Sequence, residues 1–183
     1  KNGEILAAAS FPEYDLNKFV SGITREEWVI LADDLNHPFT NKLVNGLYPP
    51  GSVVKMGVGM AMMNSGIITP NTTFESTGTM ELGGRVFRDW KKEGHGMISY
   101  VRAIRESCDD YFYKASLKTG IDIIAPFLSK IGFAAKTGID LPREFMGTVP
   151  SREWKKARFG KGWSQGETLI SSIGQGYFLV TPV

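Results

Sequence analysis

Residues 48–55 read Tyr-Pro-Pro-Gly-Ser-Val-Val-Lys, and together with the apolar stretch behind them they decide the fold. Two prolines and a glycine before Ser52 suit the start of a helix, and the Asn-Ser-Gly at 64–66 suits its end. Gly57 and Gly59 lie inside this stretch although glycine is a poor helix former. We therefore expect a buried helix against which neighbouring backbone approaches closely.

Ser52 and Lys55 are three residues apart, which places a hydroxyl and an amine on one face of this helix. The N–H groups at a helix start suit a developing oxyanion. Serine is a weak nucleophile until a base takes its proton, and lysine is such a base only as the neutral amine. Burial among Val53, Met56 and Val58 would favour that form. The S-x-x-K pattern alone is common, but its place at the start of an apolar helix favours catalysis.

Ser107-Cys108-Asp109 lies between two predicted helices. A serine in such a turn can relay a proton, and a polar side chain two residues later can hold a substrate amide. Asp109 is equally suited to cap the following helix, so this pattern is weak evidence when taken alone.

Composition sets broad limits on the protein class. The 183 residues carry 21 Lys and Arg against 19 Asp and Glu, a net charge of +2, so nucleic acid is a weak candidate partner. A hydrophobic content of 42% is ordinary for a globular domain, and one cysteine excludes an internal disulfide. No apolar run approaches the ~18 residues of a membrane span. Because the sequence starts without Met, we expect a piece of a longer protein.

The remaining elements are expected to form one helix-rich domain with some strand. No internal repeat or interdomain linker is evident. The predicted elements are a strand at 5–9, a capped helix from Thr24, a loop-rich excursion at 67–97, helices at 99–105 and 109–117, a helix from Asp122, and an irregular region at 147–176.

Taken together, these motifs resemble the transpeptidase domain of class B penicillin-binding proteins, a family marked by S-x-x-K, S-D-N and K-T-G. The resemblance runs nearly end to end and is closest to the penicillin-binding protein 2 type used in cell elongation. The segments that carry it are GEILA (3–7), HP (37–38), YPPGSVVK (48–55), DWKK (89–92), GHG (94–96), SCD (107–109), DDYFY (109–113), KTGIDLP (136–142), SIGQGY (172–177) and TP (181–182).

The resemblance implies an α+β fold (an α/β sandwich) of the penicillin-binding and serine β-lactamase type. It also implies cross-linking of peptidoglycan stem peptides. Ser52 would attack the penultimate D-Ala carbonyl, with a neutral Lys55 as general base and the Ser52 N–H in the oxyanion hole. Ser107 would relay a proton to the leaving D-Ala, and Asp109, in place of the family's Asn, would hold the substrate. An amine of a second stem peptide would then resolve the acyl-enzyme, and a β-lactam would acylate the same serine.

The family's K-T-G triplet lies on a strand beside the active site, and two triplets here are judged decoys. Lys118-Thr119-Gly120 falls where a helix is expected to end, so its glycine suits a helix cap. Lys136-Thr137-Gly138 has no alternating strand pattern around it. We therefore expect 1–183 to be a partial transpeptidase domain, a helix-rich fragment with an incomplete antiparallel sheet. It would lack the K-T-G strand and the upstream membrane anchor and pedestal.

Four residues form a candidate metal site. Asp89, His95 and Cys108 offer a carboxylate, an imidazole and a thiol, with Glu75 as a fourth candidate, and such donors suit tetrahedral zinc. The spacing resembles a zinc site of some elongation-type relatives. A lone His between glycines is more often solvated or hydrogen-bonded, and a lone Cys is more often a small buried hydrophobe. The chemistry requires no cofactor, so any zinc would be structural.

The resemblance also implies partners and a location, and it leaves alternative functions to be distinguished. Substrates would be stem peptides, with β-lactams as inhibitors, at the periplasmic face of the inner membrane. A rod-complex scaffold protein and a membrane glycan polymerase would bind through regions outside this chain. One rival is a serine β-lactamase or β-lactam sensor, which acyl-enzyme lifetime would distinguish. Another is a non-catalytic envelope scaffold, which the intact Ser52, Lys55 and Ser107 disfavour.

Overall fold

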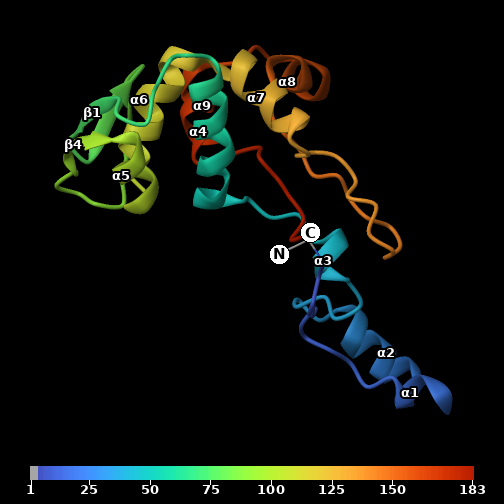
Figure 1. Ribbon diagram of the computed structural model, residues 1–183. Helices are drawn as coiled ribbons and strands as arrows, with labels where there is room; N and C mark the ends of the chain where they lie inside the picture. The colour runs from blue at the N-terminus through green and yellow to red at the C-terminus, as the bar shows by residue number, and fades with distance from the viewer. Residues whose placement is uncertain (1–3) are drawn as a thin grey trace. The chain divides into compact units, whose positions relative to one another are not determined.

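The computed structural model describes residues 4–183, and these form two compact units (Figure 1). The large unit contains Pro49–Ala135 and Met146–Val180. Among the described residues, the small unit contains 4–48, Lys136–Phe145 and Thr181–Val183. Helices predominate, and the strands that the structure describes form two small antiparallel sheets, as expected for a helix-rich α+β chain.

The predicted central helix is present in the large unit. A 3₁₀ turn η1 (Gly51–Val54) leads into α4 (Lys55–Asn64). The glycines of α4 make room for side chains and not, as predicted, for backbone: a Cβ on Gly59 would lie 2.2 Å from the Tyr100 hydroxyl, and one on Gly57 would lie 2.9 Å from Leu128. Close packing of this kind outweighs the low helix propensity of glycine.

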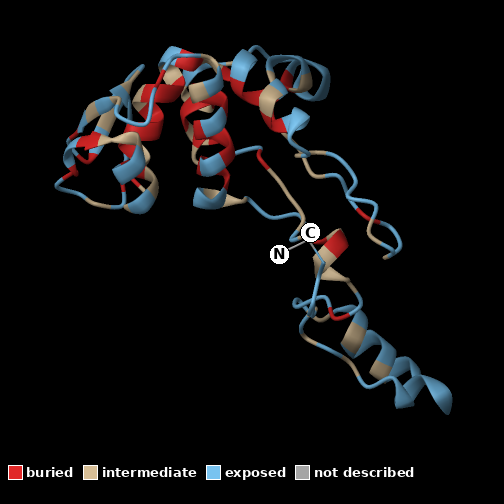
Figure 2. Ribbon diagram, in the orientation of Figure 1, coloured by how far each residue is buried: buried red, intermediate tan, exposed pale blue. Residues whose placement is uncertain are grey.

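Five further helices belong to the large unit with α4. Of these, α6 packs along α9, and α4 packs against α7 and α6 (Figure 1). Figure 2 shows the buried positions concentrated on these elements. Among the described helices the longest has 11 residues, and none is long and apolar enough to cross a bilayer. The five are α5 (Tyr100–Arg105), α6 (Asp109–Thr119), α7 (Ile121–Lys130), α8 (Arg152–Phe159) and α9 (Gln165–Ser172).

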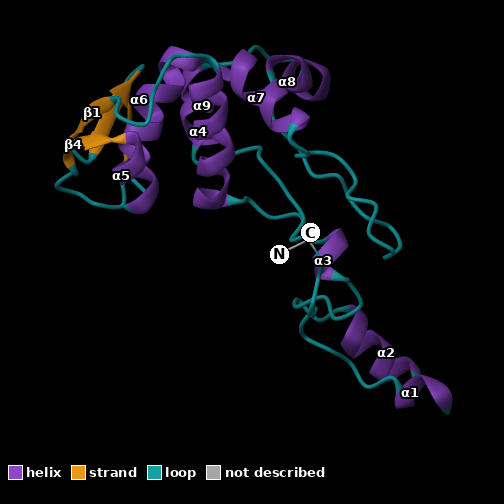
Figure 3. Ribbon diagram, viewed as in Figure 1, coloured by secondary structure: helices purple, strands orange, loops and turns teal. Residues whose placement is uncertain are grey.

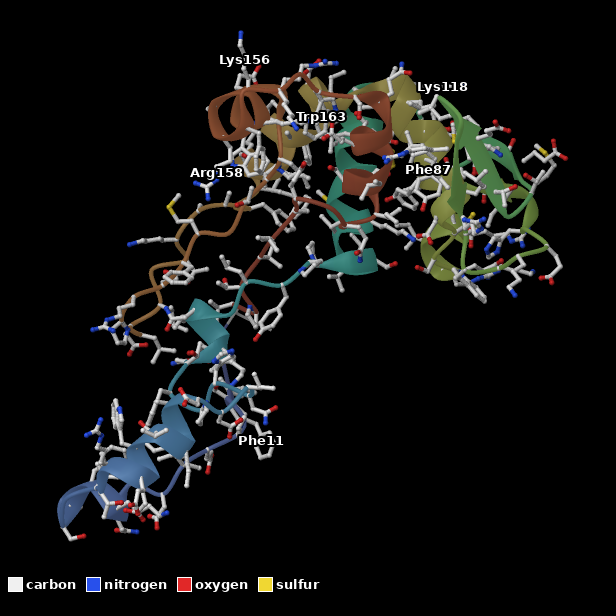
Figure 4. All side chains as sticks on the ribbon, turned by 180° about the vertical axis from the view of Figure 1, so that it is seen from behind. Phe11, Phe87, Lys118, Lys156, Arg158 and Trp163 are labelled. Atoms are coloured by element: carbon white, nitrogen blue, oxygen red, sulfur yellow. The ribbon has the colours of Figure 1, made fainter. Side chains whose placement is uncertain are left out.

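The excursion at 67–97 is more regular than the sequence predicted. β1 (Thr73–Ser76) pairs with β4 (Gly96–Ser99), and β2 (Thr79–Leu82) pairs with β3 (Arg85–Arg88), both antiparallel. Four-residue strands give too few alternating positions for a sequence pattern to show. Phe87 of β3 anchors its hairpin to the helices, with its ring 5.8 Å from that of Tyr113 (Figure 4).

In the small unit, α1 (Asn17–Val20), α2 (Arg25–Ala32) and α3 (Lys42–Asn45) are short. The predicted cap of α2 is present. The Thr24 hydroxyl oxygen accepts a hydrogen bond from the Glu27 amide, and the Glu27 carboxylate accepts one from the Thr24 amide. The predicted strand at 5–9 is wrong, since these residues form no strand and pair with none between residues 4 and 183. An apolar run without a partner strand cannot form a ladder.

Neither K-T-G triplet lies on a strand (Figure 3). Lys118 and Thr119 end α6, and Gly120 follows with a φ of +79°, a backbone region that favours glycine. The second triplet lies in a loop of the small unit, where the Glu144 carboxylate accepts hydrogen bonds from the amide and hydroxyl of Thr137. Both observations agree with the prediction that these triplets are decoys for the active-site strand.

Candidate active site

Ser52 lies in the first turn of η1 and is exposed, so its hydroxyl is accessible to a substrate. The residue before it, Gly51, has a φ of +58° and donates its amide to the Gly174 carbonyl at 2.9 Å. Gly174 itself has a φ of +70°, and a Cβ there would lie 2.3 Å from the Gly51 carbonyl oxygen. The segment after α9 therefore holds the turn that presents Ser52, a role that the sequence did not predict.

A chain of hydrogen bonds joins three of the predicted site residues. The Ser107 hydroxyl donates to Ser52 Oγ at 2.8 Å, and Lys55 Nζ donates to Ser107 Oγ at 3.2 Å. Lys55 and Ser52 are thus connected through Ser107. The structure therefore brings together Ser52 from η1, Lys55 from the start of α4 and Ser107 from the turn after α5.

Lys55 is buried, with 2% of its side chain exposed, and has three acceptors. These are Ser107 Oγ at 3.2 Å, the Ser107 carbonyl at 2.9 Å and Asp109 Oδ1 at 2.5 Å. Three acceptors around one nitrogen match the three N–H donors of an ammonium group. The neutral amine that the resemblance implies for the base has two N–H donors, so acting as the base requires the loss of one of these hydrogen bonds. Moreover, Val53 and Met56, expected to bury Lys55, are exposed, whereas Val58 is buried.

Asp109 faces Lys55 because another residue caps α6. The sequence suggested Asp109 as that cap, but Cys108 Sγ accepts a hydrogen bond from the Tyr111 amide at 3.3 Å. The Asp109 carboxylate is consequently free of capping and pairs with Lys55. Burial raises the pKa of Asp109, and the hydrogen bond from Lys55 opposes that rise. No sequence signal distinguished a cysteine cap, since Asp is the commoner cap residue.

Asp89, His95 and Cys108 form a buried cluster whose ligand atoms all lie within 4.8 Å of one another. His95 Nε2 lies 3.3 Å from Asp89 Oδ1. The other imidazole nitrogen, Nδ1, lies 3.0 Å from Glu106 Oε2, an outer partner that would orient a metal-binding histidine. Hydrogen bonds from Arg102 lower the pKa of Glu106 to about 2, so this carboxylate is ionised.

The fit of these residues to zinc depends on their donor atoms. Oxygen, nitrogen and sulfur donors suit tetrahedral zinc. Burial raises the pKa of Cys108 to about 11, so the thiol is protonated in this form and a metal would have to displace that proton. Burial alone would raise the pKa of Asp89, but the amides of Asp110 and Lys91 outweigh it and lower that pKa. Three candidates fit, whereas Glu75 is exposed on β1 and is not a member of the cluster.

Comparison with known proteins identifies the family. Residues 1–183 match the penicillin binding protein transpeptidase domain. The chain belongs to this family. The transpeptidase domain is 46% identical to the peptidoglycan D,D-transpeptidase MrdA of Salmonella typhimurium, covering all of this chain and 30% of that protein. The chain thus spans about a third of the curated relatives it matches.

Solved structures agree with this assignment. In the complex of penicillin-binding protein PBP2 with MreC from Helicobacter pylori, the similar chain is 52% identical with a TM-score of 0.93, over 99% of this chain and 34% of that one. Pseudomonas aeruginosa PBP2 in complex with WCK 5153 is 41% identical with a TM-score of 0.90, over 98% and 40%. The resemblance to the penicillin-binding protein 2 type is confirmed, and with it the fold of the transpeptidase domain.

Proposed function

We propose that the protein is a peptidoglycan D,D-transpeptidase that cross-links stem peptides through an acyl-enzyme on Ser52 during cell-wall elongation. The observation that carries this proposal is the hydrogen-bond chain Ser52–Ser107–Lys55–Asp109, which joins an exposed hydroxyl to a buried lysine and carboxylate. An activated serine needs such a base within hydrogen-bond reach, directly or through one intermediate group.

The geometry indicates how Ser52 is activated. Lys55 Nζ has three acceptors, as an ammonium group would, so it has to release a proton before it can accept one from Ser52. The nearest of these acceptors is Asp109 Oδ1. Ser107 then carries the proton of Ser52 to Lys55 as the serine attacks the penultimate D-Ala carbonyl. On collapse of the tetrahedral intermediate, the same hydroxyl returns a proton to the leaving D-Ala amine. The Ser52 amide at the start of η1 contributes to the oxyanion hole.

The relatives support a wider setting for this activity. The Helicobacter pylori PBP2 structure is a complex with MreC, and another similar chain, 33% identical, is part of a peptidoglycan synthase complex of coordinated polymerization and crosslinking. We propose that the protein works likewise with an envelope scaffold and a membrane glycan polymerase, through regions outside 1–183, at the periplasmic face of the inner membrane.

The test is acylation of the intact protein by benzylpenicillin, followed by mass spectrometry of the protein and its peptides. We expect one adduct on the Ser52 peptide that persists for hours, and none on Ser52→Ala. Rapid loss of the adduct would indicate a β-lactamase, and a long-lived adduct without cross-linking of stem peptides would indicate a β-lactam sensor. No adduct on the wild-type protein would contradict the catalytic assignment and leave the envelope scaffold.

We also propose that Asp89, His95 and Cys108 hold a structural zinc ion, which would fasten the excursion to the start of α6. Metal analysis of the purified intact protein should find about one zinc per chain. Cys108→Ser should lose the metal and lower the unfolding temperature, whereas Glu75→Gln, outside the cluster, should keep both. A wild-type protein without zinc, which also unfolds at the same temperature with and without added zinc, would contradict the proposal.

A further inference from the structure

The turn that carries Ser107 is strained, which raises the question of what holds it. Ser107 has a φ of +53°, a left-handed conformation that is unfavourable for a residue with a side chain. Such a residue keeps this conformation only where surrounding contacts determine it. The direction of its hydroxyl toward Ser52 depends on the two peptide planes on either side of its Cα.

Each of these planes has its own partners. The plane after Ser107 is held by Lys55, which donates to the Ser107 carbonyl at 2.9 Å, and by the Cys108 amide, which donates to the Ala103 carbonyl at 2.9 Å. The plane before Ser107 is held by its own amide, which reaches the Ile104 carbonyl at 3.3 Å. That bond is longer than an ordinary N–H···O bond, so the Glu106–Ser107 peptide needs a second contact to hold it.

Trp90 supplies this second contact. Its indole Nε1–H donates to the Glu106 carbonyl, the oxygen of that same peptide plane, at 3.1 Å. Trp90 is 63% exposed, and its ring packs edge-on against that of His95, with 5.5 Å between the ring centroids. The neighbouring Asp89 accepts the Asp110 amide at 2.9 Å, which ties this part of the excursion to α6.

We propose that Trp90 is a positioning residue of the active site: its indole N–H fixes the Glu106–Ser107 peptide and thereby the direction of the Ser107 hydroxyl toward Ser52. This assigns a role to Trp90 of the excursion, which the proposed mechanism does not otherwise use. The inference rests on the proposed function, because it concerns the rate at which Ser52 is acylated.

The variant that isolates this hydrogen bond is Trp90→Phe, which keeps an aromatic ring and removes the N–H. Because the side chain is largely exposed, the exchange removes little packing. The matched control is Trp163→Phe, also in the large unit (Figure 4), where the indole donates to Thr168 Oγ1 at 2.8 Å. Both variants lose one indole hydrogen bond, but only Trp90 donates to the Ser107 turn.

The measurement is the acylation of the intact protein by benzylpenicillin over a range of drug concentrations, which separates the limiting rate from the dissociation constant. Trp90→Phe should lower the limiting rate about threefold to tenfold, as expected for one net hydrogen bond, with dissociation constant and unfolding temperature unchanged. Trp163→Phe should lower the unfolding temperature and leave the limiting rate unchanged.

Three outcomes would overturn the inference. A limiting rate of Trp90→Phe equal to that of the wild type would show that the hydrogen bond does not position Ser107. A smaller fraction of active protein together with a lower unfolding temperature would show a structural role alone. An equal loss of rate in Trp163→Phe would show that the effect is not specific. If the wild-type protein itself forms no adduct, the proposed function fails, and with it this inference.

Discussion

The capping box of α2 and the candidate active site differ in the reach of the contacts that hold their polar side chains. In the small unit the capping box of α2 joins Thr24 to Glu27, three residues apart, and Glu144 holds Thr137 across seven. In the large unit Lys55 reaches Asp109 across 54 residues. Local contacts form a helix such as α2 although none of its residues is buried. The site depends instead on distant segments, so its geometry is a product of core packing.

The comparison is tested most strongly by the two buried lysines of the large unit. Lys55 pairs with Asp109 and Lys155 pairs with Glu167, each at 2.5 Å. Lys55→Met should lower the benzylpenicillin acylation rate by about 10²–10⁴, the range of a lost general base. Lys155→Met should lower the stability by about 1–3 kcal/mol, since its pair is only partly exposed, and leave the rate unchanged. An equal loss of rate in both variants would mean that any broken ion pair disables the fold.

A second pair of variants separates a long-range contact from a local backbone preference. Gly174 and Gly160 have φ values of +70° and +66°, so alanine is strained at both by about 1 kcal/mol or more. A Cβ on Gly174 would collide with Gly51, whereas one on Gly160 would meet nothing within 4 Å. Gly174→Ala should therefore also displace the turn of Ser52 and slow acylation about 10-fold or more.

The measurement is the acylation rate and the unfolding free energy of each glycine variant. Gly160→Ala should change only the unfolding free energy. If Gly174→Ala acylates at the wild-type rate, the segment after α9 does not set the position of Ser52, and its contact with Gly51 is structural alone.

Much of the site could be predicted from the sequence, because its chemistry follows from short motifs. Ser52 and Lys55 share a helix face by spacing alone, and the family resemblance brought Ser107 and Asp109 to the same place. The contacts between these residues could not be predicted. That Lys55 has three acceptors depends on how the Ser107 turn meets α4, and such packing leaves no trace in a local pattern.

The fold was predictable where a signal was local. The capping box of α2 and the glycine after α6 are confirmed, because each is a contact or backbone preference within a few residues. The strand at 5–9 was wrong because a strand needs a partner, which an apolar run cannot reveal. The four short strands of the excursion were missed for the converse reason, since pairing formed them without a visible alternation.

The smallest effect is expected from a local contact of the small unit. The pKa of Glu144 is lowered from its usual 4.5, chiefly by the hydrogen bond from the Thr137 amide and then by the Thr137 hydroxyl. A carboxyl whose pKa is lower when folded contributes stability above its unfolded pKa, and loses it as the pH falls through the lowered value. The loop of the second K-T-G triplet should therefore loosen in acid, below about pH 4.5.

Glu144→Gln tests this directly, because glutamine does not ionise in this range. The difference in unfolding midpoint between wild type and variant should be present near neutral pH and shrink as the pH falls below about 4.5. Acylation of Ser52 at neutral pH should be equal in the two proteins, since Glu144 holds only the loop of the small unit. A difference in unfolding midpoint that stays constant with pH would mean that the loss in the variant does not come from the charge of Glu144. A slower acylation would mean that a local contact of the small unit also shapes the site, and the distinction between such local contacts and the long-range contacts of the site would then not hold.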